Sequence, residues 1–271
     1  MMQYPAGYYR TEHRALTLRE LIRWYGLMQL PHRWVEARRK TPSAGVWMPG
    51  LWADLECRKE ELPAHFWQAT ARQRNFFQTM GFVEYGFGRF KPGTSLNPVV
   101  RETCRIIYLD NSYSQIAGLL CHKLRIPAKI GKDTTVRMRR GTVATIQGPR
   151  FSEAEITQVI VWLTSVFEKS TFSCTNNRNS FNPLPGDKVV WVFSDDTAAI
   201  YAGFRNNLPR WRGSPRVFSD QSSLRAWFDA SQIKAFEARV RRRLFVKMTD
   251  EEIEEARGRM PPENPKRLGA G

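Results

Sequence analysis

Two runs of apolar, β-branched and aromatic residues flank a turn signal in residues 99–121, VVRETCRIIYLDNSYSQIAGLLC. The runs Val99 to Leu109 and Tyr113 to Cys121 have the composition of β-strands, and Asp110-Asn111-Ser112 between them is typical of a tight turn. An antiparallel hairpin is therefore predicted here, and the segments on either side are interpreted around it.

Neighbouring segments extend this hairpin into a sheet. Phe82 to Phe90 has strand composition, while Thr134 to Arg139 and Thr142 to Gln147 form a second predicted hairpin around the turn Arg140-Gly141. These segments predict a central meander of about four or five antiparallel strands.

The N-terminal third is predicted to be helical. Thr17 and Glu20 have the spacing of a capping box in front of apolar residues at helical intervals. A second helix is predicted from about Pro63 to Met80, and Gly81 is its expected stop signal.

A further capping-box pattern, Ser152 and Glu155, stands in front of apolar residues at helical spacing. On this pattern we predict a helix from about Glu153 to Lys169 that covers the sheet. The apolar residues concerned are Ile156, Val159, Ile160, Leu163 and Phe167.

The C-terminal third is predicted to be mostly helical after a turn-rich boundary at Cys174 to Asp187. Its predicted elements are a strand at Lys188 to Phe193, a helix at Thr197 to Asn207, one or two longer helices at Ser222 to Met248, and a last helix from Thr249 to about Met260.

Together these elements predict an α+β fold. We expect an N-terminal helical layer, a central antiparallel sheet covered by a helix, and a mainly helical C-terminal part. The predicted regions are a helical, aromatic-rich region at 1–81, the sheet and its covering helix at 82–173, a strand and helices at 186–260, and a flexible tail at 261–271.

Composition excludes several classes of protein. The chain is 42% hydrophobic and so is not a disordered basic tail, and it has neither an apolar run long enough to span a membrane nor an N-terminal apolar core typical of a secretory signal. Its four cysteines form no C-x-x-C pair, which disfavours a zinc ribbon, and their density disfavours a disulfide framework. We therefore expect a cytoplasmic protein in a reducing environment, without a cofactor or metal.

The strongest signal is the net charge of +16, from 42 Lys and Arg against 26 Asp and Glu. Three segments carry this excess: 123–150, 198–216 and 234–247. The first includes the basic face of the second hairpin, the second a loop in which two Arg flank a Trp, and the third a predicted helix. The candidate binding residues are Arg137, Arg139 and Arg140; Arg205, Arg210, Trp211 and Arg212; and Arg239, Arg241, Arg242, Arg243 and Lys247.

Guanidinium groups bind phosphates while an indole stacks on a base, so these residue types predict a non-catalytic protein that binds RNA or single-stranded DNA. Two readings compete with this one. An interaction or assembly protein would use the same charges against an acidic protein or an anionic membrane surface. A bias towards Arg in the whole proteome would raise the charge without any ligand. A shared surface for the three segments would favour binding, whereas separate surfaces would weaken that hypothesis.

Catalytic patterns are weak. The chain has no H-E-x-x-H, G-x-S-x-G or phosphate-loop motif, and Asp195-Asp196 is better explained as the cap of the following helix. An enzyme of unrecognised class would have to assemble Asp195, Asp196, His122 or Ser231 from distant segments. A helix-turn-helix at residues 18–40 is disfavoured against an ordinary helical hairpin, because Pro31 and bulky Trp residues fit the motif poorly.

Overall fold

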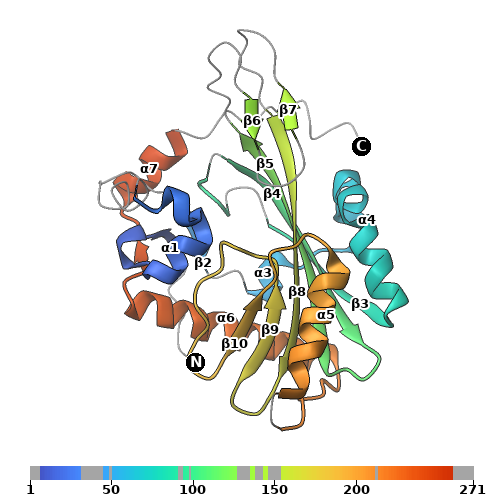
Figure 1. The fold of residues 1–271 in the computed structure, drawn as a ribbon. Coiled ribbons are helices and arrows are strands. Elements are labelled where there is room, and N and C mark those ends of the chain that lie inside the picture. Colours follow the sequence, from blue (N-terminus) through green and yellow to red (C-terminus); the bar gives the residue numbers. More distant parts are fainter. Residues whose placement is uncertain are drawn as a thin grey trace.

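The centre of the molecule is a mixed sheet of six strands (Figure 1). The computed structural model describes residues 7–31, 45–48, 51–90, 94–97, 99–126, 135–137, 143–145, 154–210 and 213–258. Within these residues the fold is α+β, as the sequence predicts. The sheet has the order β10-β9-β8-β5-β4-β3, formed by β3 (Phe82–Arg89), β4 (Val100–Asp110), β5 (Gln115–Ile126), β8 (Ala154–Val166), β9 (Thr171–Thr175) and β10 (Lys188–Trp191).

The hairpin of β4 and β5 is confirmed, with Cys104 opposite Cys121. Asp110 ends β4 and fixes the turn, because its Oδ1 accepts hydrogen bonds from the backbone N–H groups of Ser114 and Gln115 at 2.9 and 2.8 Å. All neighbouring strands in the sheet are antiparallel except β9 and β10, which are parallel, so the sheet is mixed where an antiparallel one is predicted.

The predicted helix at Glu153 to Lys169 is wrong, because this segment forms strand β8. It pairs with the whole of β5, from Gln115 opposite Ser165 to Ile126 opposite Ala154. Residues 159–163 are apolar at every position, since Val161 and Leu163 pack on one face of the sheet and Trp162 on the other. A strand buried on both faces therefore satisfies helical spacing by coincidence.

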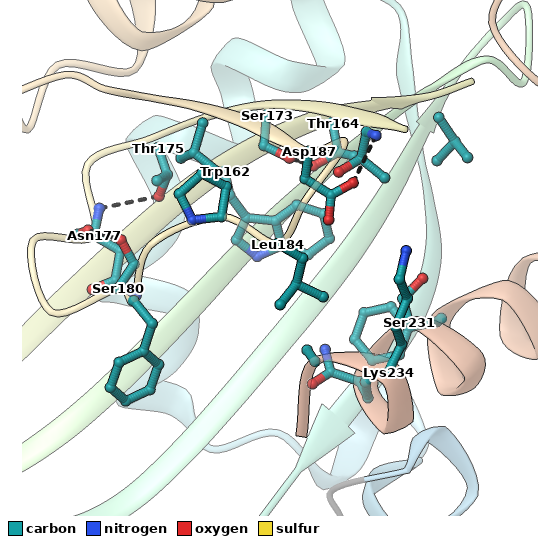
Figure 2. Close-up of a pocket in the computed structure, with 18 of the residues that line it drawn as sticks. Trp162, Thr164, Ser173, Thr175, Asn177, Ser180, Leu184, Asp187, Ser231 and Lys234 are labelled. Atoms are coloured by element: carbon teal, nitrogen blue, oxygen red, sulfur yellow. Dashed lines mark hydrogen bonds between the residues drawn. The ribbon is translucent and has the colours of Figure 1, made fainter. Parts of the chain in front are cut away.

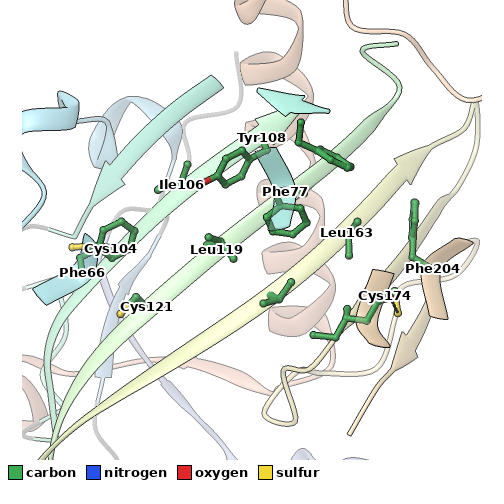
Figure 3. Packing of buried hydrophobic residues seen from close by; sticks show 14 of the residues in the cluster. Phe66, Phe77, Cys104, Ile106, Tyr108, Leu119, Cys121, Leu163, Cys174 and Phe204 are labelled. Carbon is green, nitrogen blue, oxygen red and sulfur yellow. Dashed lines mark hydrogen bonds between the residues drawn. The ribbon is translucent and has the colours of Figure 1, made fainter. Parts of the chain in front are cut away.

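Helices α4 (Ala64–Thr79) and α5 (Thr197–Asn207) cover one face of the sheet (Figures 1 and 3). Both are confirmed, and Gly81 follows α4 in the left-handed region at φ 79°. Figure 3 shows how Phe66 and Phe77 of α4 meet sheet residues, with Phe204 of α5 packed further along the same face. This face holds most of the core, including Ile106, Tyr108, Leu119, Leu163, Phe172 and Cys174.

The opposite face is covered by α3 (Trp52–Leu55) and α6 (Gln221–Arg241). Two strand glycines make room for indole rings there. A Cβ on Gly86 would lie 2.4 Å from the Trp52 ring, and one on Gly118 would lie 2.2 Å from the Trp162 ring. Ile107, Leu109, Ile116, Phe218, Leu224 and Phe228 complete this second apolar cluster.

A second, smaller sheet lies beside α6 and has the order β11-β1-β2, formed by β1 (Gly7–Thr11), β2 (Gly45–Met48) and β11 (Phe245–Lys247). The helix predicted to run to Met248 ends instead at Arg241, and Arg243 takes the left-handed conformation at φ 57°. Strand β11 then begins at Phe245, which packs against Phe181 and Phe236, directly after the buried Leu244.

The remaining elements are short or peripheral. Helix α1 (Leu18–Tyr25) has the predicted capping box of Thr17 and Glu20, and α7 (Asp250–Gly258) confirms the last predicted helix. In the second hairpin, β6 (Thr135–Arg137) pairs with β7 (Val143–Thr145) in a separate two-stranded sheet and does not join the central sheet as predicted, while its predicted turn lies outside the described residues. Single 3-10 turns occur at His13–Ala15, Leu27–Gln29, Lys59–Glu61 and Leu208–Arg210. Among the described helices, none is long and apolar enough to cross a membrane.

Candidate functional site

A cavity of about 720 Å³ lies between the sheet and α6 (Figure 2). Strands β8 and β9 form one wall, α6 forms the facing wall, and the loop at 176–187 encloses one side. Figure 2 shows Trp162, Thr164 and Ser173 from the sheet, with Ser231 and Lys234 of α6 across from them. A volume of this size suits a small organic ligand or a single nucleotide.

Hydroxyl groups on the sheet wall are held by one another or by the backbone. The hydroxyls of Thr164 and Ser173 lie 2.7 Å apart, and the Thr175 hydroxyl donates to the carbonyl of Val161 and accepts from the N–H of Asn177. These groups are therefore fixed in place before any ligand enters.

The lining also includes aromatic and basic side chains, among aliphatic and amide residues. Rings come from Phe90, Trp162, Phe167, Phe181, Trp227 and Phe228. Five basic residues line the cavity, namely Arg105, Lys169, Arg216, Lys234 and Arg239, against the acidic residues Glu168 and Asp187. Asp187 accepts a hydrogen bond from the backbone N–H of Thr171 at 2.9 Å, which fixes the position of its carboxylate in the cavity wall.

Arg105 is the most deeply buried of these cations, with 6% of its surface exposed. Its guanidinium lies over the rings of Trp52 and Phe228, at 5.0 and 4.8 Å from their centres. Among the residues that the structure describes, no group hydrogen-bonds to its Nε or Nη2. Burial lowers the pKa of Arg105 to about 10, against an opposing effect of Asp229, so the side chain remains charged at neutral pH.

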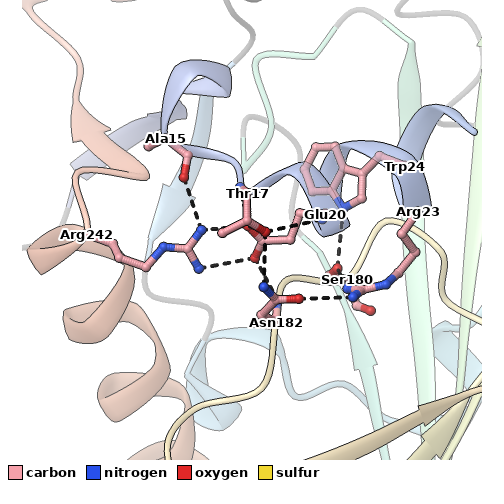
Figure 4. A network of polar contacts seen from close by, with 8 residues as sticks. All are labelled: Ala15, Thr17, Glu20, Arg23, Trp24, Ser180, Asn182 and Arg242. Atoms are coloured by element: carbon pink, nitrogen blue, oxygen red, sulfur yellow. Dashed lines mark hydrogen bonds and ion pairs between the residues drawn. The ribbon is translucent and has the colours of Figure 1, made fainter. Parts of the chain in front are cut away.

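The loop wall is held by a polar network around Glu20 (Figure 4). The Glu20 carboxylate accepts two hydrogen bonds from Arg242, at 2.6 and 3.1 Å, and one from the backbone N–H of Asn182 at 2.7 Å. Arg23 donates to the carbonyl of Ser180 and to the Asn182 side chain. The network thus joins α1, the end of α6 and the loop at 176–187.

This network also determines the charge state of Glu20, which is completely buried. Burial alone raises the pKa of its carboxyl, but hydrogen bonds from Arg242, Asn182 and Thr17 outweigh burial and lower the pKa to about 2. Arg242 is therefore a structural partner of Glu20, with its charge directed into the protein.

The binding residues predicted from the sequence lie in three separate parts of the structure. Some of these residues lie outside the described ranges. Arg137 belongs to β6, while Arg139, Arg140, Trp211 and Arg212 lie outside the described residues. Arg205 is exposed near the end of α5, which covers the sheet face opposite the cavity, and Arg210 is exposed in the 3-10 turn that follows this helix. The structure does not bring this pair together with the basic residues at the end of α6 (Figure 1).

The third basic segment does not lie on one helix, because α6 ends within it. Arg239 lines the cavity, and its guanidinium lies 4.7 Å from the centre of the Phe181 ring. Arg241 pairs with Glu237 at 3.8 Å, whereas Arg243 and Lys247 are exposed. The acidic helix α7 follows this segment directly, with Asp250, Glu251, Glu252, Glu254 and Glu255.

The residues considered for catalysis remain apart. Asp196 caps α5, accepting from the N–H of Ala198 at 3.3 Å, as predicted, and His122 bonds to Thr103 at 2.8 Å. Of the four candidates only Ser231 lines the cavity, beside Lys234. All four cysteines are free, and no group of three or more His, Cys, Asp or Glu that could hold a metal ion occurs in the described part of the chain.

Sequence reasoning missed the cavity and its buried cation. The available signal was Arg105 itself, a lone Arg inside the apolar strand segment at 104–109. The residues that line the cavity lie between positions 55 and 239, so no single stretch of sequence predicts the cavity.

Comparison with protein-family models, with curated proteins and with solved structures found no match to this chain. Its function therefore has to be inferred from the cavity and the charge distribution.

Proposed function

We propose that this protein binds single-stranded nucleic acid, RNA or DNA, and that one nucleotide enters the cavity beside α6. The observation that supports this function is the combination of five basic residues with indole and phenyl rings in a cavity of about 720 Å³. Single-stranded nucleic acids are bound by this combination, since bases stack on aromatic rings while phosphates contact Lys and Arg.

The accessible part of the lining has the required chemistry. Arg216 and Lys234 are exposed at the cavity and can contact phosphates, whereas Trp162 and Trp227 are partly buried and offer ring surface for stacking. The proposed site therefore differs from the candidate binding residues that the sequence favours, although Arg239 belongs to both sets, and Arg216 and Lys234 fall within two of the three basic segments.

The exposed basic residues elsewhere have a different role in this proposal. Arg205 on α5 and Arg210 in the turn that follows are exposed and do not line the cavity, so in this proposal they add to the positive field without contacting the ligand there. A net charge of +16 attracts a polyanion over a distance and speeds its encounter with the site.

The test compares two double variants that each remove two positive charges. We expect Arg216→Ala with Lys234→Ala to weaken the binding of a fluorescent single strand by about tenfold or more, because these residues contact phosphates. Arg205→Ala with Arg210→Ala is the matched control on the opposite face, for which we expect a loss of about threefold at most. Fluorescence anisotropy between about 50 and 200 mM salt measures both effects.

Several outcomes would count against the proposal. Equal losses in the two double variants would remove the cavity from the site, and affinity that is indifferent to salt would exclude phosphate contacts. Sedimentation with anionic vesicles, but no binding of RNA or DNA, would favour docking on a membrane surface instead.

A further inference from the structure

We infer that the cavity receives the terminal phosphate of a strand, and that Arg105 is the residue that holds it. This inference rests on the proposed function and specifies which part of a nucleic acid enters the site. It follows from the unmet hydrogen-bonding capacity of Arg105, from its rigid surroundings and from its depth.

Arg105 is a buried charge without a hydrogen-bonded counterion among the described residues. The nearby Asp229 carboxylate accepts a hydrogen bond from the backbone N–H of Trp52 at 2.6 Å, and Glu56 is paired with Arg225. A buried guanidinium whose N–H groups lack hydrogen-bond acceptors destabilises the folded protein unless a partner accepts those hydrogen bonds. An anion entering the cavity would provide that partner.

The guanidinium is held in position before a ligand arrives. Trp52 and Phe228 flank it, and their rings meet edge to face with centres 5.3 Å apart. Gly88 leaves the space that its Nε needs, since a Cβ there would lie 2.6 Å from that atom. These contacts hold the guanidinium in one orientation, with its Nε against Gly88 and with Nε and Nη2 shielded from solvent.

The depth of Arg105 favours the end of a nucleic-acid strand over an internal nucleotide as the ligand. Arg105 lines the cavity with only 6% of its surface exposed, so a ligand can reach little of the side chain. An internal phosphate would need room for the strand to enter and to leave, whereas a terminal phosphate needs a single entry. A terminal phosphate also carries a charge of about −1.5 to −2 at pH 7, so the basic residues of the lining together attract it more strongly than the single charge of a phosphodiester.

The experiment uses the full chain and one oligonucleotide of about ten residues, prepared with a 5′-phosphate, with a 3′-phosphate or with hydroxyl groups at both ends. We expect one phosphorylated form to bind about tenfold more tightly than the hydroxyl form. A nucleoside monophosphate of the same terminal base, and inorganic phosphate, serve as competitors that separate a strand end from a free anion.

Two substitutions at Arg105 test its role. We expect Arg105→Gln to remove the preference for the phosphorylated end while leaving affinity for the hydroxyl form within about threefold, and Arg105→Lys to retain only part of the preference because it cannot bind bidentately. Lys234→Gln is the control, because it should weaken all three oligonucleotides equally. Circular dichroism and thermal unfolding establish that each variant is folded.

The outcomes separate this inference from the proposed function. Tight but equal binding of all three oligonucleotides by the natural protein would overturn the terminal-phosphate inference and leave the proposed function standing. No binding of any oligonucleotide would overturn both. Binding of the nucleoside monophosphate more tightly than the phosphorylated strand would show a site for a free nucleotide and overturn the inference, and the natural protein decides these cases even where an Arg105 variant does not fold.

Discussion

Two buried charges in this protein have opposite environments. Glu20 is paired with Arg242 and accepts further hydrogen bonds, whereas Arg105 has Nε and Nη2 without a partner among the described residues. A satisfied buried charge fixes neighbouring elements, and an unsatisfied one is available to a ligand. The first thus holds the cavity wall together, and the second is the residue that we propose to bind the ligand.

Glu20 makes stability depend on pH in a defined direction. Its pKa is about 2 in the folded protein against 4.5 ordinarily, so the unfolded chain binds the proton more readily and stability falls as pH falls from about 5 towards 2. The shift corresponds to about 3 kcal/mol in the free energy of unfolding. We expect Glu20→Gln to lower that free energy at pH 7 and to remove this part of the pH dependence, as measured by urea unfolding.

The matched control for this measurement is Glu60→Gln, since Glu60 is exposed on the surface. Its urea midpoint should stay close to that of the natural protein at each pH. If Glu20→Gln and the natural protein lost stability in parallel between pH 5 and 2, the ion pair with Arg242 would not be responsible.

Individual elements were predictable where a local signal agrees with the tertiary environment. The turn at 110–112 and the capping box of α1 are local, and both are as expected. Strand β8 matches helical spacing because both faces of its second half are buried, so the apolar residues there show no alternation. The cavity was not predictable, since its lining is assembled only when β8, β9, α6 and the loop at 176–187 come together.

The contact between β5 and β8 gives a prediction about packing. Gly118 lies under the Trp162 indole, where a Cβ would approach the ring to 2.2 Å. We expect Gly118→Ala to lower the free energy of unfolding by about 1–3 kcal/mol and to shift Trp162 at the cavity wall. Thermal unfolding and tryptophan fluorescence measure the two effects.

Two further variants establish the cause. Gly258→Ala is the control, because a Cβ there meets no described atom within 4 Å and should leave the melting temperature nearly unchanged. Adding Trp162→Leu to Gly118→Ala should recover part of the lost stability by removing the ring. If Gly118→Ala lowered stability equally with Trp162 and with Leu at position 162, the loss would come from the backbone conformation of the strand and not from contact with the indole ring.

At the scale of the whole molecule, the sheet separates two kinds of surface. The face under α4 and α5 is closed by the main core, and the face under α6 contains the cavity. Because Arg205 and Arg210 lie at the end of α5, their charges act on a ligand at the cavity only through the long-range field. We therefore expect Arg205 and Arg210 to affect the association rate of a nucleic acid, and residues in the cavity to affect its dissociation rate.

Association and dissociation rates test this division. We expect Arg205→Ala with Arg210→Ala to slow the association of a single strand at low salt by about two- to threefold and to leave the dissociation rate unchanged, because only the attractive field is reduced. Trp227→Ala should instead raise the dissociation rate by about tenfold, since it removes a stacking surface worth about 1–3 kcal/mol per base. Stopped-flow fluorescence at two salt concentrations measures both rates. A faster dissociation in the double variant would mean that the strand extends across the far face, and the binding surface would then be larger than the cavity.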